Sequence, residues 1–383
     1  MKKCALLSFT PLRQDPRINR QVGWLRPHYD LVTLGPADAP IAGVPCLDCG
    51  LRSQPLGRLW RAGLLATRRF ESFYWQSNHV QVAFAKLRAW KPDLIIANDI
   101  DTLPLAIRLR EHFARHTHHT ARVLFDAHEF YPEVYAADPL WKTFVQPYMR
   151  ALCKRYMPRA DARVTVSPGV ASLYKQWLGL ELEVVYNAPA YQALKPRPSD
   201  PQRIRMIHHG HAIPDRRLET LIEITRRLDP RFELHLMLVP DPGGYLQQLQ
   251  QLAAGHERIH FHPPVAMPQI VSRIHEFDLG VYLLPAVHNN NLHALPNKFF
   301  EFIQARLAVA ISPNPDMAGI VQHYGCGLVS PDYSAESLFA LLRQLDAGQL
   351  DLYKQASERA AQELCAERAG ERFVALAQEL CPA

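Results

Sequence analysis

The sequence of 383 residues lacks a long apolar run, because no stretch reaches the roughly eighteen uninterrupted apolar residues of a membrane-spanning helix. Its first apolar stretch is cut short by Pro11, Arg13 and Asp15, so we expect a first strand there and no signal peptide. Internal repeats and low-complexity tracts are also missing. These absences predict a globular protein of the cytoplasm.

Regularly spaced cysteines are missing as well. The seven cysteines are odd in number and irregular in spacing, which excludes a disulfide framework and suits a reducing compartment. Cys46 and Cys49 form a lone Cys-x-x-Cys pair, and without a second pair we expect no metal or redox role for it. No known nucleic-acid-binding module is present.

The loop after the first predicted strand, Thr10–Gln21, has no glycine-rich phosphate motif, which excludes a Rossmann dinucleotide site there.

The chain has an apolar content of 48%, a charged content of 21% and enough length for two domains. The charge is unevenly spread. Residues 1–190 carry 25 Lys and Arg against 16 Asp and Glu, whereas residues 191–383 carry 18 against 21. The first half is therefore expected to face something anionic.

The most basic and aromatic segment is Leu51–Trp75, in which arginines alternate with Leu, Phe, Tyr and Trp. One interpretation is a helix on an anionic membrane face, with Arg58, Arg61, Arg68 and Arg69 over the headgroups. The other is an amphipathic helix whose apolar side belongs to the core. The composition is compatible with both.

Polar residues follow the predicted strands of the first half. We expect strands at 3–9, 29–34, 93–99, 123–129, 162–167 and 183–187. Asp99, Asp126, His128 and Glu129 stand at strand ends, and ligands of open parallel sheets bind outside the carboxyl ends of strands. For Asp99 and Asp101 the simpler interpretation is a helix N-cap.

Residues 191–203 are rich in proline and lack periodicity, which predicts a linker between a domain of residues 1–190 and one of residues 204–365. In the second domain a strand from Ile204 leads to Gly210, and a helix with Arg216 and Arg217 near its start follows. A turn glycine before two arginines is suited to clamp a diphosphate. His208, His209 and His211 alternate along a strand, so we expect no metal there.

The segment Leu295–Ser312 predicts a short helix entered through Pro296 and then a buried strand from Leu307 to Ile311. Lys298 and Glu301 are three residues apart and share one helix face. The helix start could hold a phosphate with Lys298, and Glu301 could accept hydrogen bonds from a ribose diol. An ordinary surface helix is the alternative.

The run Pro296-Asn-Lys-Phe-Phe-Glu-Phe302, followed by an apolar strand, resembles the donor-site segment of GT-B glycosyltransferases, above all the retaining, family 4-like enzymes. Asp15-Pro-Arg17, Asn98-Asp-Ile-Asp101, Asp126-Ala-His-Glu129 and Val166-Ser-Pro-Gly169 resemble successive landmarks of their N-terminal, acceptor-binding domain. One position departs from the family, since His293 stands where many members carry an acidic residue eight positions before Glu301.

The resemblance implies two Rossmann-like α/β domains facing a cleft, with residues 366–383 forming a helix that returns to the first domain. It implies sugar transfer from a nucleotide diphosphate sugar to an acceptor hydroxyl with retention, without a metal ion or other cofactor. The donor would be bound by Gly210, Arg216 (or Arg217), Val265, Asn297, Lys298 and Glu301. The acceptor side would comprise Arg17, Asp99, Asp126, His128 and Glu129. Catalytic roles would fall to His128, Arg216, Lys298 and Glu301.

Synthesis of a bacterial surface polysaccharide or glycolipid is the expected setting, with a carbohydrate or lipid-linked acceptor and no nucleic acid as partner. The enzyme could then sit peripherally on the inner face of the cell membrane. Two other functions remain open on this fold: a nucleotide-sugar 2-epimerase or hydrolase, and a non-catalytic nucleotide-binding relative, which the departure at His293 allows.

Overall fold

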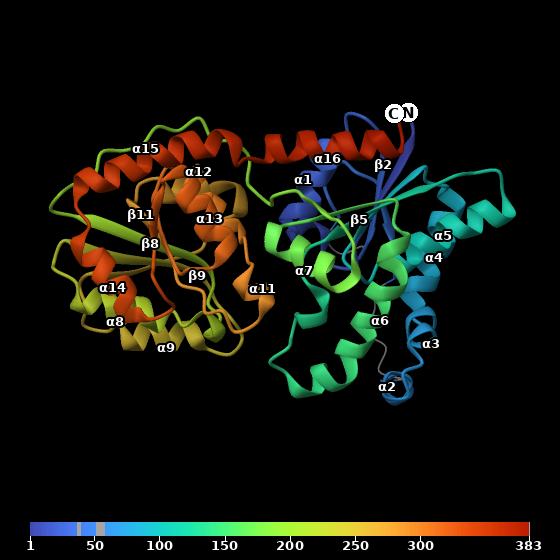
Figure 1. The fold of residues 1–383 in the computed structure, drawn as a ribbon, viewed down its shortest axis with the longest axis horizontal. Coiled ribbons are helices and arrows are strands. Elements are labelled where there is room, and N and C mark those ends of the chain that lie inside the picture. Colours follow the sequence, from blue (N-terminus) through green and yellow to red (C-terminus); the bar gives the residue numbers. More distant parts are fainter. Residues whose placement is uncertain (37–39, 51–57, 383) are drawn as a thin grey trace. The chain divides into compact units, whose positions relative to one another are not determined.

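The protein, represented here by a computed structural model that describes residues 1–36, 40–50 and 58–382, divides into two compact α/β units. Unit 1 comprises Met1–Tyr186 and the end of the chain from Ala369, and unit 2 comprises Asn187–Arg368 (Figure 1). Residues 191–203, predicted as a linker, belong to unit 2. They are fixed there by Lys354, whose Nζ donates to the Arg197 carbonyl at 3.1 Å and to Ser199 Oγ at 2.9 Å.

Unit 1 is built on a parallel sheet whose described strands have the order β3-β2-β1-β4-β5-β6-β7. These strands are β1 (Lys3–Leu7), β2 (Asp30–Gly35), β3 (Cys46–Asp48), β4 (Leu94–Asn98), β5 (Arg122–Ala127), β6 (Ala162–Thr165) and β7 (Glu183–Val184). The helices are α1 (Pro16–Leu25), α2 (Arg58–Ala66), α3 (Phe70–Trp75), α4 (Asn78–Trp90), α5 (Leu103–His116), α6 (Gln146–Tyr156), α7 (Pro168–Leu178) and α16 (Ala366–Leu380), with the short helical turns η1 (Leu12–Gln14), η2 (Tyr131–Glu133), η3 (Trp141–Val145) and η4 (Met157–Arg159). The edge strand β3 was not predicted from the sequence.

The alternation of β1 shows how this sheet is buried on both faces. Ala5 and Leu7 point into a core formed with α4, α5 and α6, whereas Cys4 and Leu6 point into a second core on the other face. Strands covered on both faces are uniformly apolar, which is why the sequence of β1 reads as a continuous apolar run.

The last helix, α16, closes the second of these cores. Phe373 is fully buried, its ring centroid lies 5.6 Å from that of Trp24, and it packs with residues of α1 and β1. Gly370 permits this approach, because a Cβ at that position would lie 2.5 Å from the indole of Trp24. The end of the chain is thus part of the fold of unit 1.

Unit 2 is also built on a parallel sheet, with the described strands in the order β10-β9-β8-β11-β12-β13. These are β8 (Ile204–His211), β9 (Phe232–Val239), β10 (Ile259–His262), β11 (Leu279–Tyr282), β12 (Ala308–Ile311) and β13 (Gly327–Val329). The helices are α8 (Glu219–Arg227), α9 (Tyr245–Leu252), α10 (Ile270–Ile274), α11 (Asn289–Leu292), α12 (Asn297–Gln304), α13 (Pro315–Tyr324), α14 (Ala335–Gln344) and α15 (Ala347–Glu363), with the turns η5 (Pro214–Arg216) and η6 (Met267–Gln269).

Helix α12 is seated on this sheet by its phenylalanines, since Phe299, Phe300 and Phe302 are completely buried. Gly280 of β11 makes room for it, because any side chain there would overlap the ring of Phe302. The interpretation of this segment as an ordinary surface helix is therefore wrong: even Lys298 and Glu301 are almost inaccessible to solvent.

The basic and aromatic segment Leu51–Trp75 falls partly outside the described residues, which resume at Arg58. In its described part Phe70, Phe73 and Trp75 pack against the core of unit 1. Arg61 is also bound internally, with Nη1 2.7 Å from Ser77 Oγ. These contacts favour the core interpretation of the segment, although Trp60 stays 61% exposed.

No helix among the described residues is long and apolar enough to cross a membrane. All seven cysteines lie in the described ranges and are free thiols.

Replacing Phe373 by alanine should lower the free energy of unfolding of unit 1 by about 3–5 kcal/mol, the usual cost of deleting a buried ring. Urea denaturation of this variant measures the effect, with Leu140→Ala as the control because Leu140 is 71% exposed in the same unit. Equal stability of the Phe373→Ala variant and the wild type would mean that α16 is not part of the fold of unit 1.

Candidate functional site

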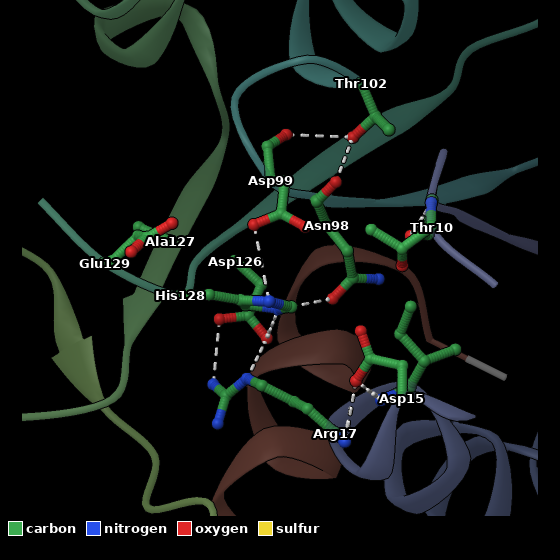
Figure 2. A network of polar contacts seen from close by, with 12 residues as sticks. Thr10, Asp15, Arg17, Asn98, Asp99, Thr102, Asp126, Ala127, His128 and Glu129 are labelled. Atoms are coloured by element: carbon green, nitrogen blue, oxygen red, sulfur yellow. Dashed lines mark hydrogen bonds and ion pairs between the residues drawn. The ribbon is translucent and has the colours of Figure 1, made fainter. Parts of the chain in front are cut away.

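The carboxyl edge of the sheet in unit 1 carries a network of charged residues (Figure 2). Asn98 ends β4, Asp126 lies in β5, and His128 directly follows β5. Parallel strands place these ends side by side, because Asn98 pairs with Asp126 in the sheet register. The first helix contributes the fourth member, Arg17.

Arg17 is aimed at Asp126 by the cap of its helix. Asp15 caps α1 by accepting hydrogen bonds from the amides of Arg17 and Ile18 at 2.9 and 3.2 Å. Arg17 then donates from Nε and Nη2 to both carboxylate oxygens of Asp126, at 2.5 and 2.8 Å, and from Nη1 to the Val185 carbonyl at 2.8 Å. The bidentate geometry is that of a strong, charge-assisted pair.

Both members of this pair were predicted on the acceptor side. Arg17 and Asp126 are 2% and 0% exposed and bind one another. Gln21, one turn after Arg17, donates a further bond to Asp126 Oδ2 at 2.5 Å. Both charged groups are therefore engaged within the protein in this structure.

His128 lies between two carboxylates. Its Nδ1 is 3.4 Å from Asp99 Oδ1, and its Nε2 is 3.6 Å from Asp126 Oδ2 and 3.2 Å from Asn98 Oδ1. Burial lowers the pKa of His128, but the charges of Asp99 and Asp126 outweigh it and raise the pKa to about 9. The imidazole is therefore a cation at neutral pH, with both ring nitrogens as donors, and it keeps 19% of its side chain exposed.

The pKa of Asp126 moves in the opposite direction. Burial raises it, but the charges of Arg17 and His128 prevail and hold it at about 2. The sign of the pH dependence follows for both groups. The stabilisation from cationic His128 is complete below its unfolded pKa of about 6.5 and is lost as the pH rises through 9. That from Asp126 is present above about 3.9 and is lost as the pH falls through 2.

Asp99 does not cap a helix, contrary to the expectation from the sequence. The residue before α5 is Thr102. Asp99 instead has a left-handed backbone, with φ of 65°, and its carboxylate accepts a hydrogen bond from the Tyr131 hydroxyl at 2.9 Å. Glu129 is half-buried nearby, and burial together with the charge of Asp99 raises its pKa to about 7.

The carboxyl edge of the sheet in unit 2 holds the second candidate site, centred on Lys298 of α12. His208 fixes this lysine. Its Nδ1 must donate to the Val281 carbonyl at 2.8 Å, so its Nε2 is free to accept from Lys298 Nζ at 3.1 Å. The ammonium group also lies 4.7 Å from the centre of the Tyr282 ring. Burial and the nearby charge of Arg216 lower the pKa of Lys298 well below its usual value.

The absence of a side chain at Gly210 leaves room for a second cation, Arg216, near Lys298. The φ of Gly210 is +111°, and a Cβ there would lie 3.2 Å from Lys298 Nζ and 3.6 Å from Arg216 Nη1. The side chain of Arg216 is oriented by a hydrogen bond from its Nη1 to the His211 carbonyl at 3.0 Å. Arg217 is exposed, with a left-handed backbone that ends η5. Of the two arginines, the structure therefore groups Arg216 with Lys298.

Glu301 lies one turn after Lys298. Its Oε2 is 3.4 Å from Nε2 of His209, whose ring also contacts Phe302 edge-on at 5.3 Å. Burial, Lys298 and Arg216 together lower the pKa of His209 to about 3, so this ring is neutral. No role for His208 or His209 was predicted from the sequence. Two histidines at the end of a strand before a glycine are the signal that could have identified them.

The remaining predicted donor residues lie in loops and helix starts of unit 2. Val265 is half-buried after β10, and Asn297 begins α12. Asn297 Oδ1 is buried and accepts no hydrogen bond from the described part of the chain. His293 has its Nδ1 2.7 Å from Oδ2 of the nearly buried Asp316.

One group of side chains in the described ranges has the composition of a metal site: Glu233, His235 and His260, whose ligand atoms lie within 4.8 Å of one another. Arg203 neutralises Glu233, since its Nε and Nη2 donate to both carboxylate oxygens at 2.8 and 2.9 Å. His235 Nδ1 is bound to His262 at 2.9 Å. The group therefore lacks the net negative charge that favours a dication, and we assign no metal to it.

Comparison with known proteins bears on the fold. Residues 30–188 match the family model described as Glycosyltransferase Family 4. Sucrose-phosphate synthase from Thermosynechococcus elongatus has a similar structure, at 14% identity and a TM-score of 0.74, with 99% of each chain covered. So has HepE from Anabaena in complex with UDP-glucose, at 15% identity and a TM-score of 0.72, over 99% of this chain and 100% of that one.

An α,α-trehalose-phosphate synthase (UDP-forming) from Burkholderia vietnamiensis aligns over 99% of this chain and 100% of its own, at 12% identity and a TM-score of 0.68. No curated protein matches the sequence significantly. These alignments confirm the predicted fold over the whole chain.

Replacing Asp99 by asparagine should lower the pKa of His128 from about 9, because the largest favourable charge next to the imidazolium is lost. An opposite charge at this distance typically changes the pKa of a group by about 1–3. The pKa of Glu129 should fall in the same variant, since Asp99 raises it by like-charge repulsion.

Both values can be followed by NMR titration of labelled His and Glu side chains. Asp101→Asn is the matched control and should leave His128 unchanged, because His128 owes its raised pKa to Asp99 and Asp126. An unshifted His128 in the Asp99→Asn variant would contradict the charge arrangement described above.

Proposed function

We propose that this chain, which has the GT-B fold and whose residues 30–188 match the glycosyltransferase family 4 model, is a glycosyltransferase that moves a sugar from a nucleotide diphosphate sugar to an acceptor hydroxyl. The observation that carries the proposal is the grouping of Lys298, Arg216 and Gly210 at the carboxyl edge of unit 2. HepE binds UDP-glucose and the trehalose-phosphate synthase is UDP-forming, so a UDP-sugar is the first donor to test.

In this proposal Lys298 and Arg216 bind the donor diphosphate. Their two positive charges repel one another in the free protein, which is one reason why the pKa of Lys298 is depressed. A bound diphosphate would offset this repulsion and raise that pKa. The same charges stabilise the departing diphosphate as the glycosidic bond to it breaks, so no metal ion is required. Glu301 accepts hydrogen bonds from the ribose diol.

Acceptor activation falls to unit 1 in this proposal. The acceptor oxygen forms the new bond to the anomeric carbon and must lose its proton. His128 is already protonated at neutral pH, so it is unsuited to accept that proton. A donor phosphate oxygen takes it instead, as retention implies, and the His128 cation orients the sugar and the acceptor. Glu129 and Asp99 border the same edge.

His293 completes the sugar-binding part of the donor site. The family usually places an acidic residue there, and this chain has a histidine bound to the carboxylate of Asp316 at 2.7 Å. We assign the pair to the hydroxyl groups of the transferred sugar. A histidine backed by a carboxylate keeps its ring orientation and remains able to hydrogen-bond with its other nitrogen.

The proposed setting is the synthesis of a bacterial surface polysaccharide or glycolipid, with a carbohydrate or lipid-linked acceptor. Peripheral attachment to the inner face of the membrane would suit a lipid-linked acceptor and the basic first half of the chain. A nucleotide-sugar 2-epimerase or hydrolase would use the same donor site. Analysis of products formed without any acceptor separates that activity from transfer.

Replacing Glu301 by glutamine should weaken uridine, UDP and a UDP-sugar alike. A charged hydrogen bond is worth roughly 1.5–3 kcal/mol, which corresponds to a loss of affinity of about tenfold to a hundredfold. Replacing Lys298 by alanine should weaken UDP and the UDP-sugar and spare uridine, because only the diphosphate is contacted. Isothermal titration with the three ligands distinguishes the two variants.

Glu257→Gln serves as the control, since Glu257 is an exposed residue of the same unit. If uridine binds equally well to the wild type and to Glu301→Gln, the assignment of the ribose to Glu301 is wrong.

Replacing His128 by alanine should leave UDP affinity unchanged and reduce turnover about 10²–10³-fold, because an oriented charge near the reacting centre is removed. Turnover is measured in EDTA with a UDP-sugar and a mixture of acceptors. His118→Ala, an exposed histidine of the same unit, is the control. Near-normal turnover of His128→Ala would assign this histidine to the structure alone, and loss of wild-type turnover in EDTA would contradict the metal-free mechanism.

A further inference from the structure

A second cationic feature of unit 1 takes no part in the function proposed above. It is a cavity of about 690 Å³ between α3, α4, α5 and α6, which lie together in unit 1 (Figure 1). We call it the arginine cavity after the five arginines that line it: Arg88, Arg108, Arg115, Arg155 and Arg159. Its volume is that of a site for a small molecule.

The cavity is distinct from the candidate site at the sheet edge. Helix α5 begins at Leu103, close to the carboxyl edge that carries His128. Its lining residues run from Arg108 to His116, five to thirteen residues further along the helix. At 1.5 Å per residue, they lie about 8–20 Å further along the helix axis from its start.

The charges around the cavity do not balance. Only two acidic residues line it, Glu71 and Glu111, so it has an excess of three positive charges even when its histidines are neutral. Both carboxylates are already engaged. Glu71 accepts from the Tyr156 hydroxyl at 2.9 Å and pairs with Arg155 at 3.4 Å. Glu111 pairs with Arg159 and, at 3.7 Å, with Arg115.

Arg88 and Arg108 are the two cations left over, since neither has a carboxylate within ion-pair distance in the described part of the chain. Arg108 is stacked on Trp75 instead, with its guanidinium carbon 4.2 Å from the ring centre. Such stacking fixes the plane of a guanidinium and leaves its N–H groups to donate outward. Like-charge crowding is visible at His112, whose pKa is lowered by burial and then by His116 and Arg88.

We propose that the arginine cavity binds the diphosphate group of a ligand, either a free diphosphate or the headgroup of a diphosphate-linked lipid. A diphosphate offers several acceptor oxygens in the spacing that planar guanidinium forks recognise in pairs. The aromatic walls formed by Trp75, Phe84 and Tyr156 leave room for part of the carrier. The arginine cavity therefore accounts for part of the basic excess of the first half of the chain.

The test uses inorganic pyrophosphate and the full chain carrying Lys298→Ala, which removes the diphosphate contact proposed for the donor site of unit 2. Titration should still show one pyrophosphate site, and the indole N–H signal of Trp75, assigned with Trp75→Phe, should shift in the NMR spectrum. Arg88→Ala combined with Arg108→Ala should weaken this site at least about tenfold, the loss of two charge-assisted contacts.

Lys154→Ala is the matched control, because Lys154 is an exposed cation on α6 that does not line the cavity. Arg108→Lys keeps the charge, loses the fork, and should bind with intermediate affinity. Failure of UDP to bind the wild type would contradict the donor site and leave this proposal intact, because the Trp75 signal reports on the arginine cavity, which Trp75 lines.

The source of the diphosphate is decided by neutral phosphatidylcholine vesicles with and without a polyprenyl diphosphate. Sedimentation only with the loaded vesicles, abolished in the double arginine variant and by free pyrophosphate, identifies a lipid headgroup. Pyrophosphate binding without sedimentation identifies a free diphosphate. The proposal is overturned if Trp75 does not respond to pyrophosphate, or if the double variant binds it as tightly as Lys154→Ala does.

Discussion

The buried pair of Arg17 and Asp126 is the interaction on which the candidate site of unit 1 depends. It joins the start of α1 to the end of β5 and, through Val185, to the chain after β7. Two charges taken out of water are costly unless each is fully bonded, and removal of one partner from such a pair typically costs about 3–5 kcal/mol. Here Asp126 is bonded to Arg17 and Gln21, and the charges of Asp99 and Asp126 together keep His128 a cation.

The two sheet edges use their basic residues in opposite ways. In unit 1 a histidine lies between carboxylates and holds its proton above neutral pH. In unit 2 a lysine is buried beside an arginine and two histidines, and its proton is loosened. The first arrangement keeps its charge at neutral pH, whereas the second disfavours the charge of Lys298. Both follow from the same principle, since burial penalises a charge and neighbours decide whether it is kept.

Much of the fold could be predicted because it is encoded locally. Apolar runs such as Leu94–Asn98 and Ala308–Ile311 are long enough to be recognised as buried strands, and their order predicts parallel sheets. Short elements and elements at a sheet edge were not predicted from the sequence. Strand β3 has only three residues and is held by its neighbour β2, and the proline-rich segment 191–203 was taken for a linker because its bonds to Lys354 are distant in sequence.

The sequence by itself determined the two-domain α/β architecture and the identity of Lys298, Glu301 and His128 as candidates, since residue type, helix spacing and position after a strand are local properties. Only the tertiary structure decided what state these side chains are in and which neighbours they have. In the tertiary structure Arg17 is buried with Asp126, and Arg216, not Arg217, lies near Lys298. His208 contacts Lys298, His209 contacts Glu301, and Asp316 contacts His293. Burial and through-space charge determine a pKa or an orientation, and both arise from residues far apart in the chain.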